Sequence, residues 1–281
     1  MIQVKKVSFS YNQNPFIEKI NIEVKQGEIF GFLGPSGAGK STLQKILTGL
    51  ITGYEGNAIV NGQESKYHDF SFYEEIGIDF EFPSLYEKLT AKQNLEFFGS
   101  LYQRKCRDIN ELLDQVGLLS DADKKVVAYS KGMKSRLNFI KALLHDPKIL
   151  FLDEPTSGLD PSNSRRMKDM ILAEKANGKT IILTTHNMQD ATELCDRVAF
   201  IVDGKIKALD TPHRLIMRRG AVKLTYTYVE DIEKTGECML SSTNEDACLR
   251  RLLLENKLKS IHSSEPTLND IFIEITGREL Q

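Results

Sequence analysis

The sequence has few cysteines and histidines, and neither type is arranged to hold a metal. The four cysteines are scattered along the 281 residues without a Cys-x-x-Cys pair, and the five histidines are not clustered. Disulfide frameworks and structural zinc sites need paired or regularly spaced ligands. We therefore expect a protein of a reducing compartment that has no structural zinc.

Long hydrophobic runs are also missing from the sequence. No stretch approaches the roughly 20 apolar residues that a membrane-spanning helix needs. Residues 1–6 show neither the apolar core nor the cleavage site of a secretion signal, so we expect none. If this protein works at a membrane, we expect another chain to cross it.

Charge of one sign does not dominate either, since the formal net charge is −2. This balance gives no general attraction to nucleic acid or to anionic lipid, so no nucleic-acid partner is expected. Short basic clusters at residues 104–107 and 218–219 are interpreted as solvated helix faces. The hydrophobic content of 41% is typical of a soluble globular protein, long enough for one large core or two modest domains.

What the sequence does contain is a glycine-rich stretch directly after the apolar run at residues 29–33. Gly34, four further residues and then Gly39-Lys40-Ser41 form the pattern of a phosphate-binding loop. Glycines let backbone N–H groups approach phosphate oxygens, and a following helix N-terminus favours negative charge. Lys40 is expected to reach the outer phosphates, and the Ser41 hydroxyl to ligate Mg²⁺. The predicted nucleotide contacts are Gly34, Pro35, Ser36, Gly37, Ala38, Gly39, Lys40, Ser41 and Thr42.

The remaining pattern alternates strands and helices, with one interruption. Two strands ahead of the loop, joined by a short turn, predict an antiparallel β layer beside the main sheet. Later runs are apolar throughout, as internal strands of a parallel sheet are. Residues 83–146 are mostly helical and are interpreted as an inserted subdomain that includes a capping box from Thr90. The predicted strands are 2–10, 20–24, 29–33, 57–60, 76–80, 149–152, 180–184 and the hairpin 197–209.

The composition changes near residue 220. Residues 222–229 alternate like a strand, residues 246–258 have a helical pattern, and a last short helix is expected after Pro266. We therefore predict a main domain over residues 1–220 and a small α+β extension over residues 221–281.

Polar residues follow three of the apolar runs. The phosphate-binding loop follows the first, Asp153-Glu154 the second and His186 the third. Ligands of open α/β sheets bind beyond the carboxyl ends of the strands, so these groups are expected at one rim. Asp153 would hold Mg²⁺, Glu154 would orient an attacking water, and His186 would contact the γ-phosphate side. The alternative for Asp153-Glu154 is an ordinary acidic strand end, which the phosphate-binding loop upstream disfavours.

Tyr11 lies at the edge of the predicted antiparallel layer. Its aromatic ring could stack on a base or cover the edge of the sheet, and the residues alone leave both interpretations open.

Together these motifs resemble those of the nucleotide-binding subunit of an ATP-binding cassette (ABC) transporter, over at least residues 1–215. Residues 129–133 (Tyr-Ser-Lys-Gly-Met) stand at the place of that family's LSGGQ signature, and residues 157–160 match its D-loop. His186 matches its switch histidine, and Tyr11 falls at the aromatic position that stacks on adenine. The resemblance implies an α/β P-loop NTPase of the ABC type, with a mostly parallel core sheet, an antiparallel layer, a helical subdomain and the C-terminal α+β extension.

The resemblance also implies an ATP hydrolase that works as a dimer with Mg²⁺. In this family ATP lies between the phosphate-binding loop of one subunit and the signature of the other, here Ser130 and Gly132. A single subunit should therefore bind ATP but hydrolyse it slowly. The implied partners are a second nucleotide-binding subunit, identical or different, and a transmembrane permease that holds the chain at the cytoplasmic face of the membrane. Residues 266–280 resemble the tail of bacterial drug-exporter subunits, which favours export over import.

Two positions depart from the family pattern. Glu81 stands where the family has its Q-loop glutamine; it keeps an oxygen for Mg²⁺ but adds charge, and we expect it to ligate the metal. The alternative is a displaced loop with an exposed Glu81. In the signature, Lys131 and Met133 replace Gly and Gln, whereas Ser130 and Gly132 remain, so the subunit is expected to be active.

Phe82, Leu85 and Tyr86 are candidates for the surface that docks a coupling helix of the permease. The alternative is that these side chains pack inside the helical subdomain.

Three other functions are alternatives to a transporter subunit. A soluble ABC ATPase of translation or DNA repair usually carries two cassettes or a long coiled coil, which this sequence lacks. A small-molecule kinase or GTPase would not need the signature, the D-loop and His186 together. An inactive regulatory subunit is disfavoured because Glu154 is present. The transported substrate is not encoded here, since its pocket would lie in another chain.

Overall fold

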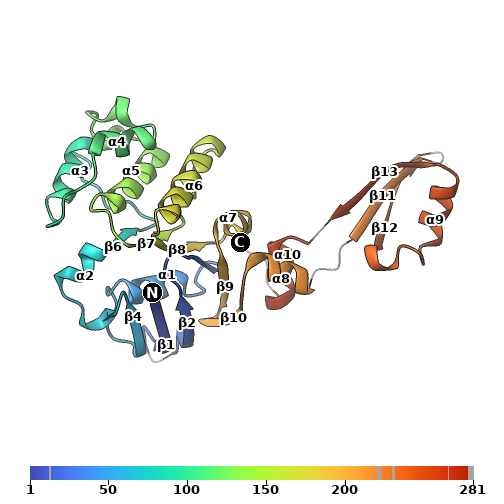
Figure 1. Cartoon of the computed structure of the whole chain (residues 1–281), viewed down its shortest axis with the longest axis horizontal. Helices are drawn as coiled ribbons and strands as arrows, with labels where there is room; N and C mark the ends of the chain where they lie inside the picture. The colour runs from blue at the N-terminus through green and yellow to red at the C-terminus, as the bar shows by residue number, and fades with distance from the viewer. Residues whose placement is uncertain (13, 220–222, 230–231, 265, 278–281) are drawn as a thin grey trace. The chain divides into compact units, whose positions relative to one another are not determined.

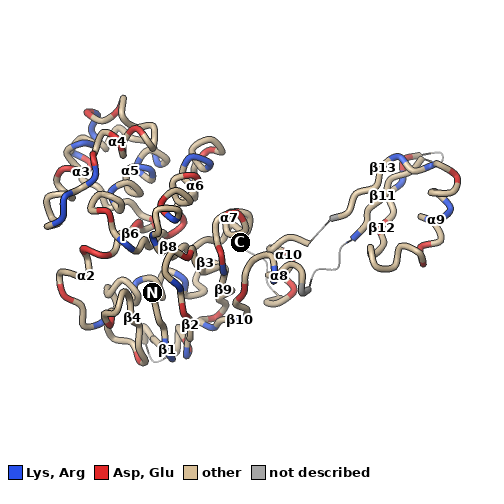
Figure 2. The backbone as a smooth tube through the Cα atoms, viewed as in Figure 1, with Lys and Arg blue, Asp and Glu red and all other residues tan. Residues whose placement is uncertain are grey.

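The computed structural model describes residues 1–281 except 13, 220–222, 230–231, 265 and 278–281. The chain forms two compact units, which divide after Leu209 (Figure 1). We call residues 1–209 the first unit and residues 210–279 the second unit. Basic and acidic residues are interspersed along the backbone of both units, in keeping with the small net charge (Figure 2).

The first unit contains an antiparallel sheet in the order β2-β1-β4-β5. Ile2 pairs with Val24 on one side and with Val60 on the other, so β1 is the central strand of this layer. Apolar residues alternate along β2 and turn inward to the main core. The antiparallel layer predicted from the sequence is therefore present. Its strands are β1 (Ile2–Phe9), β2 (Ile17–Val24), β4 (Glu55–Val60) and β5 (Gln63–Glu64).

The main sheet of the first unit has six strands in the order β10-β9-β3-β8-β7-β6. Strands β6, β7, β8, β3 and β9 run parallel, and every residue of β3, β7 and β8 is buried. Continuous apolar sequence is what a strand covered on both faces requires. The three strands that precede the candidate site residues are thus neighbours at the centre of the sheet. The strands are β3 (Ile29–Leu33), β6 (Ile76–Asp79), β7 (Ile149–Asp153), β8 (Thr180–Thr185), β9 (Arg197–Val202) and β10 (Lys205–Asp210).

Helices α3, α4 and α5 form the predicted helical subdomain between β6 and β7 (Figure 1). The capping box predicted at Thr90 is formed, because its side chain accepts from Gln93 N while the Gln93 side chain accepts from Thr90 N. The helices of the first unit are α1 (Lys40–Leu47), α2 (Phe70–Glu75), α3 (Ala91–Gly99), α4 (Ile109–Gln115), α5 (Lys131–Leu143), α6 (Pro161–Ala176) and α7 (Met188–Leu194), with short 3₁₀ turns at Ser65–Tyr67, Leu119–Asp121 and Val126–Ala128.

The basic cluster at residues 104–107 does not lie on a helix, so that part of the sequence interpretation is wrong. It follows α3 as irregular chain, where Arg104 forms an ion pair with Glu75 and Arg107 one with Glu174. Both glutamates belong to helices of the core, α2 and α6. The cluster therefore ties the helical subdomain to the core. The side chains of the other cluster, at 218–219, lie outside the described residues.

The second unit has a three-stranded antiparallel sheet, β12-β11-β13, and helix α9 shares its small core. Strands β12 and β13 were not predicted. The helix predicted over 246–258 ends at Leu254, because Asn256 takes a positive φ of 52° and Leu258 begins β13. The predicted strand start at Val222 lies outside the described residues. The elements are α8 (Pro212–Arg219), β11 (Lys223–Val229), β12 (Glu233–Met239), a 3₁₀ turn (Leu240–Ser242), α9 (Ala247–Leu254), β13 (Leu258–Ser264) and α10 (Leu268–Thr276).

Candidate active site

The glycine-rich loop runs from the end of β3 to the start of α1, as the sequence pattern requires. A Cβ atom at Gly34 would lie 2.1 Å from the Ile201 carbonyl oxygen, so no larger residue fits there. Gly37 has a φ of +77°, a conformation that glycine adopts without strain. The loop therefore owes its tight course to glycines, and it ends where α1 begins at Lys40.

The Lys40 ammonium is folded back into the loop. Its Nζ donates to the carbonyl oxygens of Gly34 at 2.6 Å and Pro35 at 3.1 Å. Burial lowers the pKa of Lys40, and the negative charges of Glu154 and Asp153 oppose that effect. A cation held between backbone carbonyls and carboxylates, at the mouth of an anion-binding loop, is suited to a phosphate group.

Ser41 and Asp153 bring two oxygen atoms together beside the loop. Ser41 Oγ donates to Asp153 Oδ1 at 3.3 Å, and the hydroxyl of Thr184 donates to the same carboxylate oxygen. Hydroxyl and carboxylate oxygens fit the preference of Mg²⁺, which protein sites often hold by one or two carboxylates together with substrate phosphates. Among the described residues no group of three or more His, Cys, Asp and Glu could hold a metal by itself. The residues thus fit a magnesium ion shared with phosphate oxygens.

Glu154 follows Asp153 at the end of β7 and points to the end of β8. His186 Nδ1 lies 2.8 Å from one carboxylate oxygen of Glu154, and Thr185 Oγ1 donates to the other at 3.2 Å. The Glu154 backbone has a positive φ of 52°, which is uncommon for a residue with a side chain, and its N–H donates to Thr184 O. Such strain is often kept where a side chain must be aimed for function.

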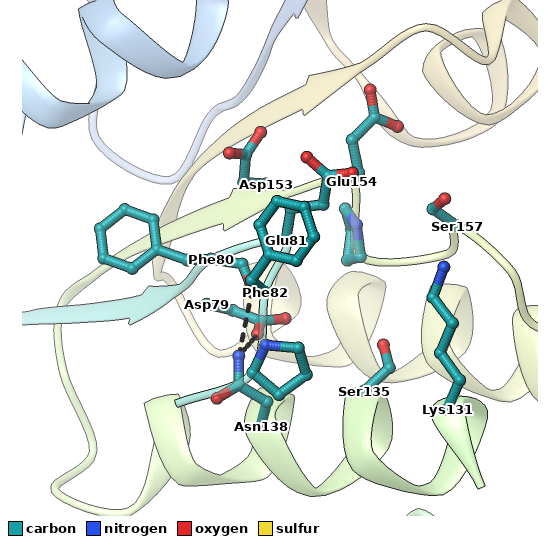
Figure 3. Close-up of a pocket in the computed structure, with 12 residues that line it drawn as sticks. Asp79, Phe80, Glu81, Phe82, Lys131, Ser135, Asn138, Asp153, Glu154 and Ser157 are labelled. Atoms are coloured by element: carbon teal, nitrogen blue, oxygen red, sulfur yellow. Dashed lines mark hydrogen bonds between the residues drawn. The ribbon is translucent and has the colours of Figure 1, made fainter. Parts of the chain in front are cut away.

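These side chains surround a cavity of about 290 Å³. It is lined by Phe16, the loop from Ser36 to Thr42, Glu81, Asp153, Glu154 and His186. A second cavity of about 200 Å³ shares Glu81, Asp153 and Glu154 and extends to Lys131 and Ser135 of α5 (Figure 3). The three strand ends and the loop therefore meet at one rim of the sheet, as expected from the sequence.

Tyr11 lies next to the glycine-rich loop but does not line either cavity. Its hydroxyl is 2.9 Å from Thr42 Oγ1, and its ring makes edge contacts with Phe9 and Phe16. Tyr11 as a whole is 57% exposed.

Ser130 and Gly132 are not brought to the loop of their own chain. They begin helix α5, where Ser130 Oγ accepts a hydrogen bond from Met133 N, and neither residue is among those described as lining the cavities. One chain thus assembles the phosphate-binding loop and the three strand ends, but not the signature residues, into a single site.

Three residues of this region were missed by the sequence interpretation as site residues: Phe16, Thr184 and Thr185. Phe16 carries no motif, although an aromatic residue five positions after Tyr11 could have been noted. The two threonines looked like ordinary residues of an apolar strand. Their hydroxyls at the very end of that strand, next to His186, were the available signal.

Comparison with known proteins agrees with this arrangement. Residues 17–157 match the family model described as ABC transporter. A fluoroquinolones export ATP-binding protein of Mycobacterium tuberculosis is 46% identical over all of this chain and 94% of its own length. The Nod factor export ATP-binding protein I of a Rhizobium species is 34% identical over all of this chain and 98% of its own length. A solved ATP-binding subunit of an ABC transporter superposes with a TM-score of 0.71 and 28% identity, over 77% of this chain and 92% of that one.

The fold and the site define a P-loop ATPase with an inserted helical subdomain. The chain belongs to the ABC transporter family, as an ATP-binding and ATP-hydrolysing subunit. The predictions of family, fold class and enzymatic activity made from the sequence are confirmed, and the relatives give no support to the soluble alternative. Within the described part of the chain, no helix has both the length and the apolar character needed to cross a membrane.

Proposed function

We propose that this chain powers a membrane exporter as one of two ATPase subunits that sandwich ATP. The observation that carries the proposal is the separation of Ser130 and Gly132 from the cavity that holds Lys40 and Glu154. A second subunit would supply the missing half of the site. The export direction is supported by relatives that are named for export and align with the whole chain.

Each candidate residue has a role in this proposal that its position permits. Lys40 and the backbone N–H groups of residues 36–42 hold the phosphates, and His186 contacts the γ-phosphate. Ser41, Asp153 and Glu81 are the residues that would hold Mg²⁺. When bound, that ion neutralises charge on the phosphate oxygens during transfer. The Glu154 carboxylate accepts a hydrogen bond from the attacking water and so orients it.

Tyr11 is proposed to stack on the adenine ring. The hydrogen bond of its hydroxyl with Thr42 and its edge contact with Phe16 hold the ring beside the loop, and the residue is exposed. A stacked aromatic pair contributes about 1 kcal/mol beyond the area that it buries.

The permease is proposed to dock on exposed aromatic side chains at the start of the helical subdomain. Phe82 is 79% exposed and Tyr86 is 51% exposed, so the alternative that these two pack inside the subdomain is disfavoured. Tyr86 contacts the ring of Phe97, which is also exposed, and this extends the apolar surface. Docking there would hold the subunit at the cytoplasmic face of the membrane. In cells, replacing Phe82 and Tyr86 by serine should move the chain from the membrane fraction to the soluble fraction.

The shared site is tested by mixing two inactive variants of the full chain. Lys40→Ala removes the loop cation, and Gly132→Asp places a negative charge at the signature, where an acidic residue near a helix N-terminus is compatible with folding. In a mixed dimer, the first variant supplies an intact signature and the second an intact loop. Equal amounts should therefore recover about a quarter of the wild-type ATPase rate, because about half of the dimers are mixed and each has one intact site.

The proposal of a shared site would be contradicted if either variant alone were fully active. It would also be contradicted if the mixture stayed inactive while co-purification of the two differently tagged variants showed that they form mixed dimers with MgATP. An inactive mixture of this kind would indicate that the whole site lies within one chain.

A further inference from the structure

A buried carboxylate lies at the point where the chain leaves the sheet for Glu81. Asp79 is the last residue of β6, is almost completely buried, and accepts a hydrogen bond from the side-chain amide of Asn138 on α5 (Figure 3). The same amide nitrogen of Asn138 also donates to the carbonyl oxygen of Phe80 at 3.2 Å. One side chain of α5 therefore fixes both the end of β6 and the peptide group next to Glu81.

Helix α5 also holds the chain on the far side of Glu81. One turn after Asn138, Lys141 Nζ donates to the carbonyl oxygen of Ser84 at 3.2 Å and lies 4.8 Å from the centre of the Phe98 ring. The segment from Asp79 to Ser84 is thus attached at both ends to the helix that begins with the signature.

The Glu81 side chain itself is not held by its neighbours. It is exposed, and among the residues that the structure describes none forms a hydrogen bond or ion pair with its carboxylate. It nevertheless lines both cavities with Asp153 and Glu154. Its place in the site must therefore be set by the backbone on either side of it.

A buried Asp–Asn pair contributes less to folding stability than apolar side chains of the same size would. The Asp79 side chain is almost completely buried, and among the described residues the side-chain oxygen of Asn138 is buried without a hydrogen-bond partner. Two apolar side chains of similar size would fill the same space at little or no cost in stability. The pair therefore needs an explanation other than stability.

We propose that Asn138 is a positioning residue, which with Asp79 fixes the backbone from which Glu81 reaches the magnesium and phosphate groups of bound ATP. This inference depends on the role of Glu81 given under the proposed function. Because Asn138 and the signature belong to one helix, Glu81 would keep its register with the signature when the helical subdomain moves.

The test compares four variants of the full chain. Asp79→Val with Asn138→Leu replaces the polar pair by an apolar one of similar size, and Asp79→Asn keeps the acceptor oxygen without the charge. Lys134→Ala is the matched control on α5, because Lys134 contacts Glu87, outside the segment 79–84. Glu81→Ala tests the residue that the pair is proposed to position.

The apolar double variant should keep the melting temperature of the wild type. Its backbone amides at residues 80–82 and 84 should exchange hydrogen faster, kcat should fall about tenfold, and the Mg²⁺ concentration for half-maximal ATPase at saturating ATP should rise. Asp79→Asn and Lys134→Ala should stay close to the wild type in all four measurements.

Unchanged hydrogen exchange and Mg²⁺ dependence in the double variant would overturn the inference and leave the pair a packing feature. If Glu81→Ala also behaves like the wild type, the proposed role of Glu81 fails instead. The two failures are therefore distinguishable. If only the positioning inference fails, Glu81→Ala is impaired while the double variant is not.

Discussion

Replacing Glu154 by glutamine should separate ATP binding from hydrolysis. The amide has the size of the carboxylate and keeps one acceptor oxygen for either Thr185 or His186, which lie 3.2 Å and 2.8 Å from the two oxygens in the wild type. It loses the negative charge that we propose orients and polarises the attacking water. A positioned base of this kind contributes a factor of about 10²–10⁴, so we expect kcat to fall about 10³-fold, which corresponds to about 4 kcal/mol in the barrier.

Binding of ATP should persist in the same variant. Glu154 does not hydrogen-bond to Lys40, although its charge is the strongest of those that raise the pKa of this lysine against the effect of burial. Removing that charge also removes a repulsion toward phosphate, so the dissociation constant for ATP should stay the same or fall.

Steady-state phosphate release and binding of a fluorescent ATP analogue measure the two effects separately. Glu193→Gln is the matched control, since this carboxylate of α7 pairs with Lys168 outside the cavity. Our reasoning would be refuted by a Glu154→Gln protein that hydrolyses ATP at the wild-type rate. It would also be refuted by one that has lost nucleotide binding.

Three further predictions concern single side chains. Lys40→Ala should abolish binding of the fluorescent ATP analogue, because Lys40 is the only buried Lys or Arg among the described residues that line the cavity. His145 is buried against Tyr102, and burial lowers its pKa from 6.5 to about 4. As the pH falls, His145 is therefore protonated in the unfolded chain at a higher pH than in the folded chain. The wild type should therefore lose about 3 kcal/mol of unfolding free energy between pH 6.5 and 4 that His145→Phe does not lose, measured by urea denaturation. Leu252→Ala in the core of the second unit should cost about 2–5 kcal/mol there by thermal denaturation, without changing ATP binding.

The parts of the fold that could be predicted from the sequence are those whose cause is local. The fully buried strands β3, β7 and β8 have continuous apolar sequence, and the glycine-rich loop follows directly from residue spacing. Strands β12 and β13 have no such pattern, since Glu233–Met239 and Leu258–Ser264 are largely polar. They form because both pair with β11, and that pairing is not visible in either segment alone.

The candidate site shows the same division. Lys40, Asp153, Glu154 and His186 follow strand runs or belong to a motif, and their meeting at one rim could be derived from the rule for parallel sheets. The hydroxyl of Thr184 and the pair of Asp79 with Asn138 depend on contacts across the sheet or between subdomains. No spacing rule joins Asp79 to a residue 59 positions later in the chain.

The two parts of the first unit contribute different halves of the proposed chemistry. The core supplies the loop and the strand ends, which we propose hold phosphate and water, whereas the helical subdomain supplies the signature that we propose completes the site of a second subunit. The segment around Glu81 joins these parts, and its hydrogen bonds run to Asn138 and Lys141 of α5. Phe82, next to Glu81, is exposed where we propose that the permease docks. A movement of α5 against the core would therefore displace the proposed metal ligand and the proposed docking surface together, which is the mechanical link that an ATP-driven transporter needs.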